Sequence, residues 1–116
     1  MKRLKYSILI FASILFSCNR QIKFDKSKWK TKDDMEYPYR DRMLKDLRTN
    51  YKLSGLKYSE IINLLGQPQV SDSTSLAYQI NINYGNDIDP DYTKYFTLIF
   101  SKDSIITLFK VEEWKK

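Results

Sequence analysis

The stretch whose residue types come nearest to metal chemistry is the acidic run Asn86 to Asp91, Asn-Asp-Ile-Asp-Pro-Asp. Calcium loops begin with such alternation, because Ca²⁺ prefers several carboxylate oxygens as ligands. A calcium loop that starts at Asp87 also needs glycine at its sixth position and glutamate at its twelfth. This sequence has Tyr92 and Leu98 there. We therefore expect a solvated acidic turn between two strands, with a weak cation site as the alternative. No resident metal or cofactor is expected.

Catalytic chemistry is limited by what the chain lacks. Histidine is absent and cysteine occurs once, at Cys18. Without histidine, Ser-His-Asp and Cys-His catalysis are excluded, as are the usual zinc-binding sets. Three glycines form no Gly-rich phosphate loop. The acidic residues do not have a spacing that indicates a catalytic carboxylate pair for hydrolysis. We therefore do not expect the protein to be an enzyme.

The N-terminal residues have the layout of a secretory signal peptide. Basic residues at positions 2, 3 and 5 precede twelve uncharged residues, Tyr6 to Ser17. Twelve residues are too few to cross the hydrocarbon core as a helix, which needs about 20. We expect residues 1–17 to be a signal peptide, with an uncleaved anchor as the alternative.

The side chain with the clearest predicted chemistry is the thiol of Cys18. It ends the segment Leu-Phe-Ser-Cys, which resembles a bacterial lipobox, although Phe16 is larger than the residue usual at that position. The resemblance implies that Cys18 becomes the first mature residue and carries acyl chains, and two or more such chains anchor a protein stably. An ordinary signal followed by an incidental cysteine is the alternative.

The positive charge of the chain is in part a property of the predicted signal peptide. The whole chain has a net charge of +6, but removing residues 1–17 leaves 17 basic and 14 acidic residues. The aromatic residues form no motif that is typical of proteins that bind single-stranded nucleic acid. We therefore expect the protein to bind no nucleic acid, and its length predicts one small domain.

Residues 18–35 are expected to form a lipidated basic tether, and residues 36–116 a small folded domain. Between positions 20 and 32, six basic residues face one acid, Asp25. Such a segment has too little apolar content to fold alone. It would lie along an anionic membrane surface or serve as a solvated spacer. Phe24 and Trp29 are the exceptions, and we expect at least one of them to dock onto the domain or into the lipid interface.

The folded domain is expected to begin with two helices. The first covers residues 37–51, where apolar residues recur at helical spacing and Pro38 suits the first position. The second follows Lys57 as N-cap, with Glu60 placed to complete half of a capping box. Gly66 ends this helix and the proline two residues later prevents its resumption.

Three strands are expected after a polar loop over residues 70–75. Residues 76–84 alternate apolar and polar side chains, and residues 93–100 and 105–111 read as a hairpin. Trp114 is expected to close the core. Two helices followed by strands predict an α+β fold, with both helices packed on one face of a three-stranded antiparallel sheet.

This order of motifs resembles a known family of small lipoproteins. An arginine-bearing helix leads to Leu53-x-Gly55, then to Tyr58-Ser59-Glu60-Ile61 and Leu64-Leu65-Gly66-x-Pro68. Residues 36–111 thereby resemble the SmpA/OmlA (BamE-like) lipoproteins and the wider ααβββ set that includes β-lactamase-inhibitor-like (BLIP-like) domains. The resemblance implies that fold, with a place in the assembly of outer-membrane β-barrels as the family's setting.

The expected function is a membrane-anchored, non-enzymatic interaction module at the periplasmic face of the outer membrane, with envelope proteins as partners. Tyrosine and arginine are favoured at interface hot spots, and they concentrate at the start of the first helix. The candidate contacts are Tyr37, Tyr39, Arg40 and Arg42. The alternative is a ligand-binding module or an enzyme inhibitor that uses an exposed sheet face around Tyr84, Tyr92 and Tyr95.

Overall fold

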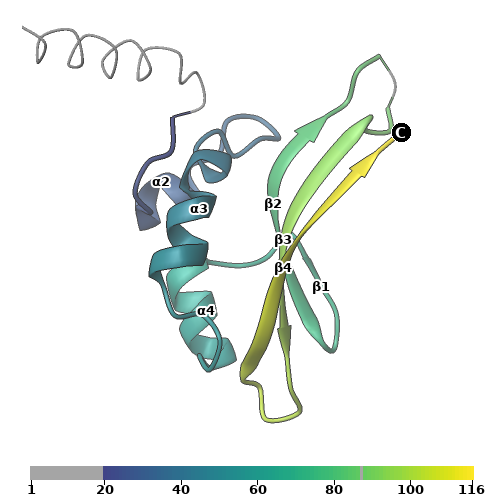
Figure 1. The fold of residues 1–116 in the computed structure, drawn as a ribbon. Helices are drawn as coiled ribbons and strands as arrows, with labels where there is room; N and C mark the ends of the chain where they lie inside the picture. The colour runs from purple at the N-terminus through teal and green to yellow at the C-terminus, as the bar shows by residue number, and fades with distance from the viewer. Residues whose placement is uncertain (1–19, 87) are drawn as a thin grey trace, which may run out of the picture.

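The computed structural model describes residues 20–86 and 88–116 (Figure 1). The predicted signal peptide and the predicted lipid-attachment residue Cys18 lie outside these residues, as does Asp87 of the acidic run. In the described part of the chain, no helix combines the length and the apolar character needed to cross a membrane.

The described residues form an α+β domain in which three helices cover one face of a four-stranded antiparallel sheet (Figure 1). The helices are α2 (Lys26–Lys30), α3 (Arg40–Asn50) and α4 (Tyr58–Leu65). The strands are β1 (Val70–Ser71), β2 (Ser75–Asn83), β3 (Tyr92–Phe100) and β4 (Ile106–Lys115). They lie in the order β1-β2-β3-β4, so each strand pairs with the next along the chain. The predicted fold class is confirmed, and the predicted element count is corrected.

The additional strand, β1, was missed because it has only two residues, Val70 and Ser71, followed by a polar run. Val70 pairs with Ala77 and Ser71 with Leu76, so β1 and β2 form a tight hairpin within the expected loop. The Asp72 carboxylate closes the turn by accepting the backbone N–H groups of Thr74 and Ser75, both at 2.8 Å. These bonds hold the pKa of Asp72 below its usual range.

The domain begins earlier than the predicted boundary at residue 36. Trp29 is completely buried, and its indole N–H donates to the backbone oxygen of Leu65 at 3.1 Å. Burying a tryptophan is worth on the order of 4 kcal/mol, so one such side chain is enough to hold a short basic segment on the domain. The described part of the predicted tether is therefore held on the domain, and the expected docking of Trp29 is confirmed.

Further contacts hold this N-terminal segment along α3. The Ile22 N–H donates to the backbone oxygen of Arg42 at 2.9 Å, and the Phe24 N–H donates to the Asp46 carboxylate at 2.7 Å. Asp25 caps α2 by accepting two backbone N–H groups, as N-cap residues do. Asp25 and Asp46 both have lowered pKa values because these hydrogen bonds favour the ionised form.

The predicted ends of α4 are confirmed. Lys57 is the N-cap, and its backbone N–H donates to the Glu60 carboxylate at 2.9 Å. Gly66 ends the helix with φ +80°, and its N–H donates to the backbone oxygen of Ile62. The first predicted helix instead starts at Arg40, because Pro38 and the residue after it form a turn.

Replacing Lys57 with threonine is expected to stabilise the domain by about 1 kcal/mol, because threonine can accept an N–H of the first turn and lysine cannot. Thermal unfolding followed by circular dichroism should show a midpoint about 4–8 °C higher. Lys52→Thr, at an exposed position outside the helices, is the matched control and should leave the midpoint unchanged. An unchanged or lower midpoint for Lys57→Thr would contradict the cap.

The core lies between the helices and the inner face of the sheet, defined here as the face toward the helices. Leu76 pairs with Leu98 and Tyr78 with Phe96, and all four are fully buried. Their partners from the helical layer and its flanking loop are Trp29, Met43, Leu44, Leu47, Leu53, Ile61 and Leu65. Alternation along each strand then sends every second side chain to the outer face.

Candidate functional site

The first group of predicted contact residues does not form an exposed surface. Arg40 is only 2% exposed, so it does not belong to an exposed contact surface, and that part of the prediction is wrong. Its Nε donates to the backbone oxygen of Trp29 at 2.8 Å. One terminal nitrogen donates to Gln69 Oε1 at 2.8 Å and to the backbone oxygen of Gln79 at 2.9 Å. The side chain thus joins α2, β2 and the segment before β1.

Aromatic rings surround the Arg40 guanidinium. Its central carbon lies 3.5 Å from the centroid of the Tyr37 ring and 4.7 Å from that of Trp29. No carboxylate of the described residues lies within ion-pair distance. Burial lowers the pKa of Arg40 to about 10, so the side chain stays charged at neutral pH.

The other three predicted contacts hold the N-terminal segment. Arg42 donates from Nε to the backbone oxygen of Arg20 at 3.0 Å. Lys28 lies over the Tyr39 ring, 5.9 Å from its centroid, and the Tyr37 hydroxyl accepts from Gln69. These contacts join the three residues to their surroundings inside the domain. All three are half-exposed, so their role as partner contacts stays a prediction.

The three tyrosines of the alternative site lie on different surfaces. Tyr95 lies on the outer face, whereas Tyr92 is three residues earlier along β3 and points to the opposite side of the sheet. The Tyr92 hydroxyl donates to Glu113 at 2.8 Å, and burial together with this bond raises the pKa of Tyr92 to about 12. Burial also raises the pKa of Tyr95. The sequence prediction of one shared aromatic face is therefore wrong.

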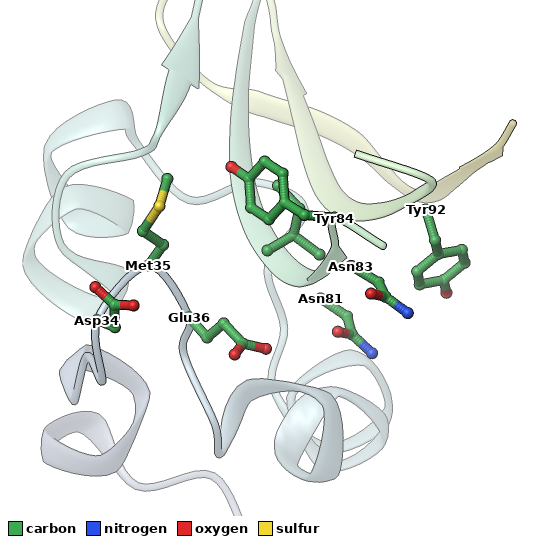
Figure 2. Close-up of a pocket in the computed structure, with 8 residues that line it drawn as sticks. Asp34, Met35, Glu36, Asn81, Asn83, Tyr84 and Tyr92 are labelled. Carbon is green, nitrogen blue, oxygen red and sulfur yellow. The ribbon is translucent and has the colours of Figure 1, made fainter. Parts of the chain in front are cut away.

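Tyr84 and Tyr92 instead line a pocket of about 360 Å³ at the end of the β2–β3 hairpin (Figure 2). Figure 2 shows the Tyr84 ring extending toward Met35 and the Glu36 carboxylate extending toward Asn81. Carboxylates and carboxamides in this pocket can hydrogen-bond a small polar molecule. They provide no nucleophile paired with a base. No group of three or more His, Cys, Asp or Glu in the described ranges could hold a metal ion.

The most distinctive surface is the outer face, the side of the sheet that carries no helix in the described residues (Figure 1). The strand register places Thr93 beside Trp114 and Ile99 beside Leu108 on this face, with Val70 beside Ala77. Val70, Leu108 and Trp114 are 54%, 48% and 52% exposed. Trp114 therefore does not close the core, and that prediction is wrong. Exposed large apolar side chains on one face are a feature of binding surfaces.

A groove of about 460 Å³ runs over this face. Tyr95 and Trp114 supply its aromatic surface, and Glu112 supplies a carboxylate. Glu113 also borders the groove, but it pairs with Lys94 in the register and its carboxylate accepts from Tyr92 on the inner face. The Thr97 hydroxyl donates to Glu112 at 2.7 Å, and Lys110 lies 3.6 Å from the same carboxylate. The groove thus combines apolar area with negative charge that is already oriented.

Comparisons of this chain with protein-family models, with curated proteins and with solved structures found no match. The site is therefore defined by its geometry.

Sequence reasoning missed both the buried role of Arg40 and the outer face. A signal for the second was present, because Leu108, Lys110, Glu112 and Trp114 alternate with the residues that face inward. Ending the predicted strand at residue 111 removed half of that pattern. No local signal identified Arg40, since its three acceptors lie 11, 29 and 39 positions away along the chain.

Proposed function

We propose that this chain is a lipid-anchored, non-enzymatic binding module of the bacterial envelope that holds a partner protein on its outer face. The observation that carries the proposal is the half-exposed apolar and aromatic surface of the sheet, with Trp114 and Tyr95 along its groove. Acylated Cys18 would anchor the module at the periplasmic face of the outer membrane. The lipobox-like segment and the resemblance to SmpA/OmlA lipoproteins support this setting and a role in envelope assembly.

The groove favours a polypeptide segment with apolar and basic side chains. Its aromatic residues are of the types that dominate interface energetics. The Glu112 carboxylate at its edge complements a lysine or an arginine of the partner. Beyond Ile106, which bonds to the backbone of Gly55 and Leu56, the side of β4 away from β3 pairs with no strand of the described residues. An extended segment of the partner can therefore also pair with this edge.

In-cell photocrosslinking tests the proposal. A photoreactive amino acid at Leu108, on the outer face, is expected to form an adduct with an envelope protein. The same photoreactive amino acid in place of Thr49, which is exposed on α3, should not form that adduct. Trp114→Ala in the Leu108-labelled chain should reduce the adduct at least about tenfold, the effect of losing a hot-spot residue.

Two further variants separate the parts of the proposal. Ile88→Ala removes an apolar side chain that is 94% exposed but lies off the outer face, and it should leave the adduct unchanged. Cys18→Ala should incorporate no labelled fatty acid and should lose the adduct with a membrane-bound partner. Equal adducts from Leu108 and Thr49, or an adduct formed only between copies of this chain, would contradict the proposed surface. Capture of a secreted enzyme would favour the alternative function of an inhibitor.

A further inference from the structure

The Arg40 guanidinium has hydrogen-bonding capacity that the domain does not use. Its Nε and one terminal nitrogen make the three bonds described above. The second terminal nitrogen bonds to no described residue. No buried side-chain nitrogen or oxygen of the described residues lacks a partner, so this nitrogen keeps a small accessible area within the 2% exposure of Arg40. Two N–H donors of a charged group therefore face whatever occupies the adjoining space.

That space is a hollow of about 430 Å³ between the N-terminal segment, the start of α3 and the end of α4, here called the Arg40 hollow. Arg40, Tyr37 and the half-buried Ile62 line the hollow, and Leu65 borders it without any exposed surface. Lys30 lies at the rim of the hollow. The aliphatic part of its side chain lies against Gly66, because a Cβ added to Gly66 would be 3.4 Å from the Lys30 Cε. The hollow thus combines one deep cation, one surface cation and an apolar wall.

The charges around the hollow favour a singly charged anion. An unpaired buried guanidinium attracts an oxyanion strongly, because charge-assisted hydrogen bonds are about twice as strong as neutral ones. The end of α4 also borders the hollow, and a helix C-terminus carries partial negative charge. This partial charge opposes a dianion such as phosphate more than it opposes a carboxylate. The half-buried Ile62 and the aliphatic part of Lys30 add a preference for an apolar group next to the charge.

We propose that the Arg40 hollow is a binding site for a carboxylate attached to an apolar group, such as a small acylated amino acid or the C-terminal residue of a peptide. The accessible terminal nitrogen of Arg40 donates to the carboxylate, Lys30 supplies a second positive charge at the rim, and the half-buried Ile62 contacts the apolar part. The residues of this site are separate from those of the outer-face groove. The proposal therefore does not depend on the partner surface.

A titration followed by nuclear magnetic resonance tests this site, with the full chain in a neutral detergent. The probes are N-acetyl-L-leucine and N-acetyl-L-leucinamide, which have the same apolar group and differ in charge. N-acetyl-L-leucine is expected to shift the Arg40 Nε–H and Gly66 N–H signals saturably. The amide should bind at least about tenfold more weakly, the effect of losing one charge-assisted hydrogen bond.

Substitutions of exposed residues at the rim of the hollow test the site without removing a buried side chain. Lys30→Gln should weaken binding of N-acetyl-L-leucine about two- to fivefold, as expected for an exposed ion pair, and Gln67→Glu should weaken it further by repulsion. Lys102→Gln, in the β3–β4 turn, removes the same charge elsewhere and should have no effect. An N-acetylated peptide that ends in leucine should shift the same signals, and if it binds more tightly than N-acetyl-L-leucine, the natural source is a peptide end.

Three results would overturn the proposal. The first is an equal response to the amide. The second is tighter binding of inorganic phosphate than of N-acetyl-L-leucine. The third is a set of shifts spread over the lysines of α2 without a change at Arg40 and Gly66. None of these results affects the photocrosslink from Leu108, so failure of the carboxylate site and failure of the proposed function can be told apart.

Discussion

Trp29→Ala is expected to lower the free energy of unfolding by about 3–5 kcal/mol, the usual cost of removing a buried tryptophan. Trp29 is completely buried, and its indole N–H bonds to the Leu65 backbone at the end of α4. Its ring also contacts those of Phe24 and Tyr78, with centroids 5.8 and 6.1 Å away. The substitution therefore leaves a cavity and an unsatisfied carbonyl at the point where three segments meet.

The loss is large relative to the stability of a small domain, which is about 5–15 kcal/mol. Urea denaturation followed by far-ultraviolet circular dichroism measures it without relying on tryptophan fluorescence. Trp114→Ala is the matched control, because Trp114 is 52% exposed on the outer face. It should cost about 1 kcal/mol or less. Equal small losses for both variants would mean that Trp29 does not hold residues 20–35 on the domain.

Arg40→Met is expected to lower the free energy of unfolding by about 2–4 kcal/mol. Methionine fills much of the same volume, but it leaves the backbone oxygens of Trp29 and Gln79 without a donor. A buried acceptor that loses its partner costs about 1–3 kcal/mol. The loss is reduced because burying the guanidinium is itself costly, as the lowered pKa of Arg40 indicates. The free-energy cost of two unsatisfied backbone acceptors and of the lost contact with the Tyr37 ring is larger than the gain from no longer burying a charge.

Two variants define the origin of the effect. Arg40→Lys keeps the charge but presents one nitrogen in place of the planar fork that reaches three acceptors, so it should recover only a minor part of the loss. Arg42→Met changes the same residue type two positions along α3, where the side chain is half-buried and bonds to Arg20. It should cost about 1 kcal/mol or less. Full stability of Arg40→Met in urea would show that the hydrogen bonds of Arg40 contribute nothing net.

The sequence by itself determined the features that arise within one segment. The ends of α4 followed from Glu60 and Gly66, because a cap and a left-handed glycine act on the nearest backbone groups. The strands β2 and β3 followed from alternating side chains, because strand geometry has a period of two. Helices followed by strands then gave the α+β class.

Only the tertiary structure decided the features that depend on a distant partner. Trp29 lies in a segment whose composition predicts a tether, and its burial depends on a surface formed by α4 and β2. Arg40 was expected at a helix start facing solvent, and it is buried because acceptors from Trp29, Gln69 and Gln79 converge on it. The strand register separated Tyr92 from Tyr95 and joined Leu108 to Trp114 on one face. Periodicity and caps are local, whereas burial of a single side chain is decided by residues that folding brings to it.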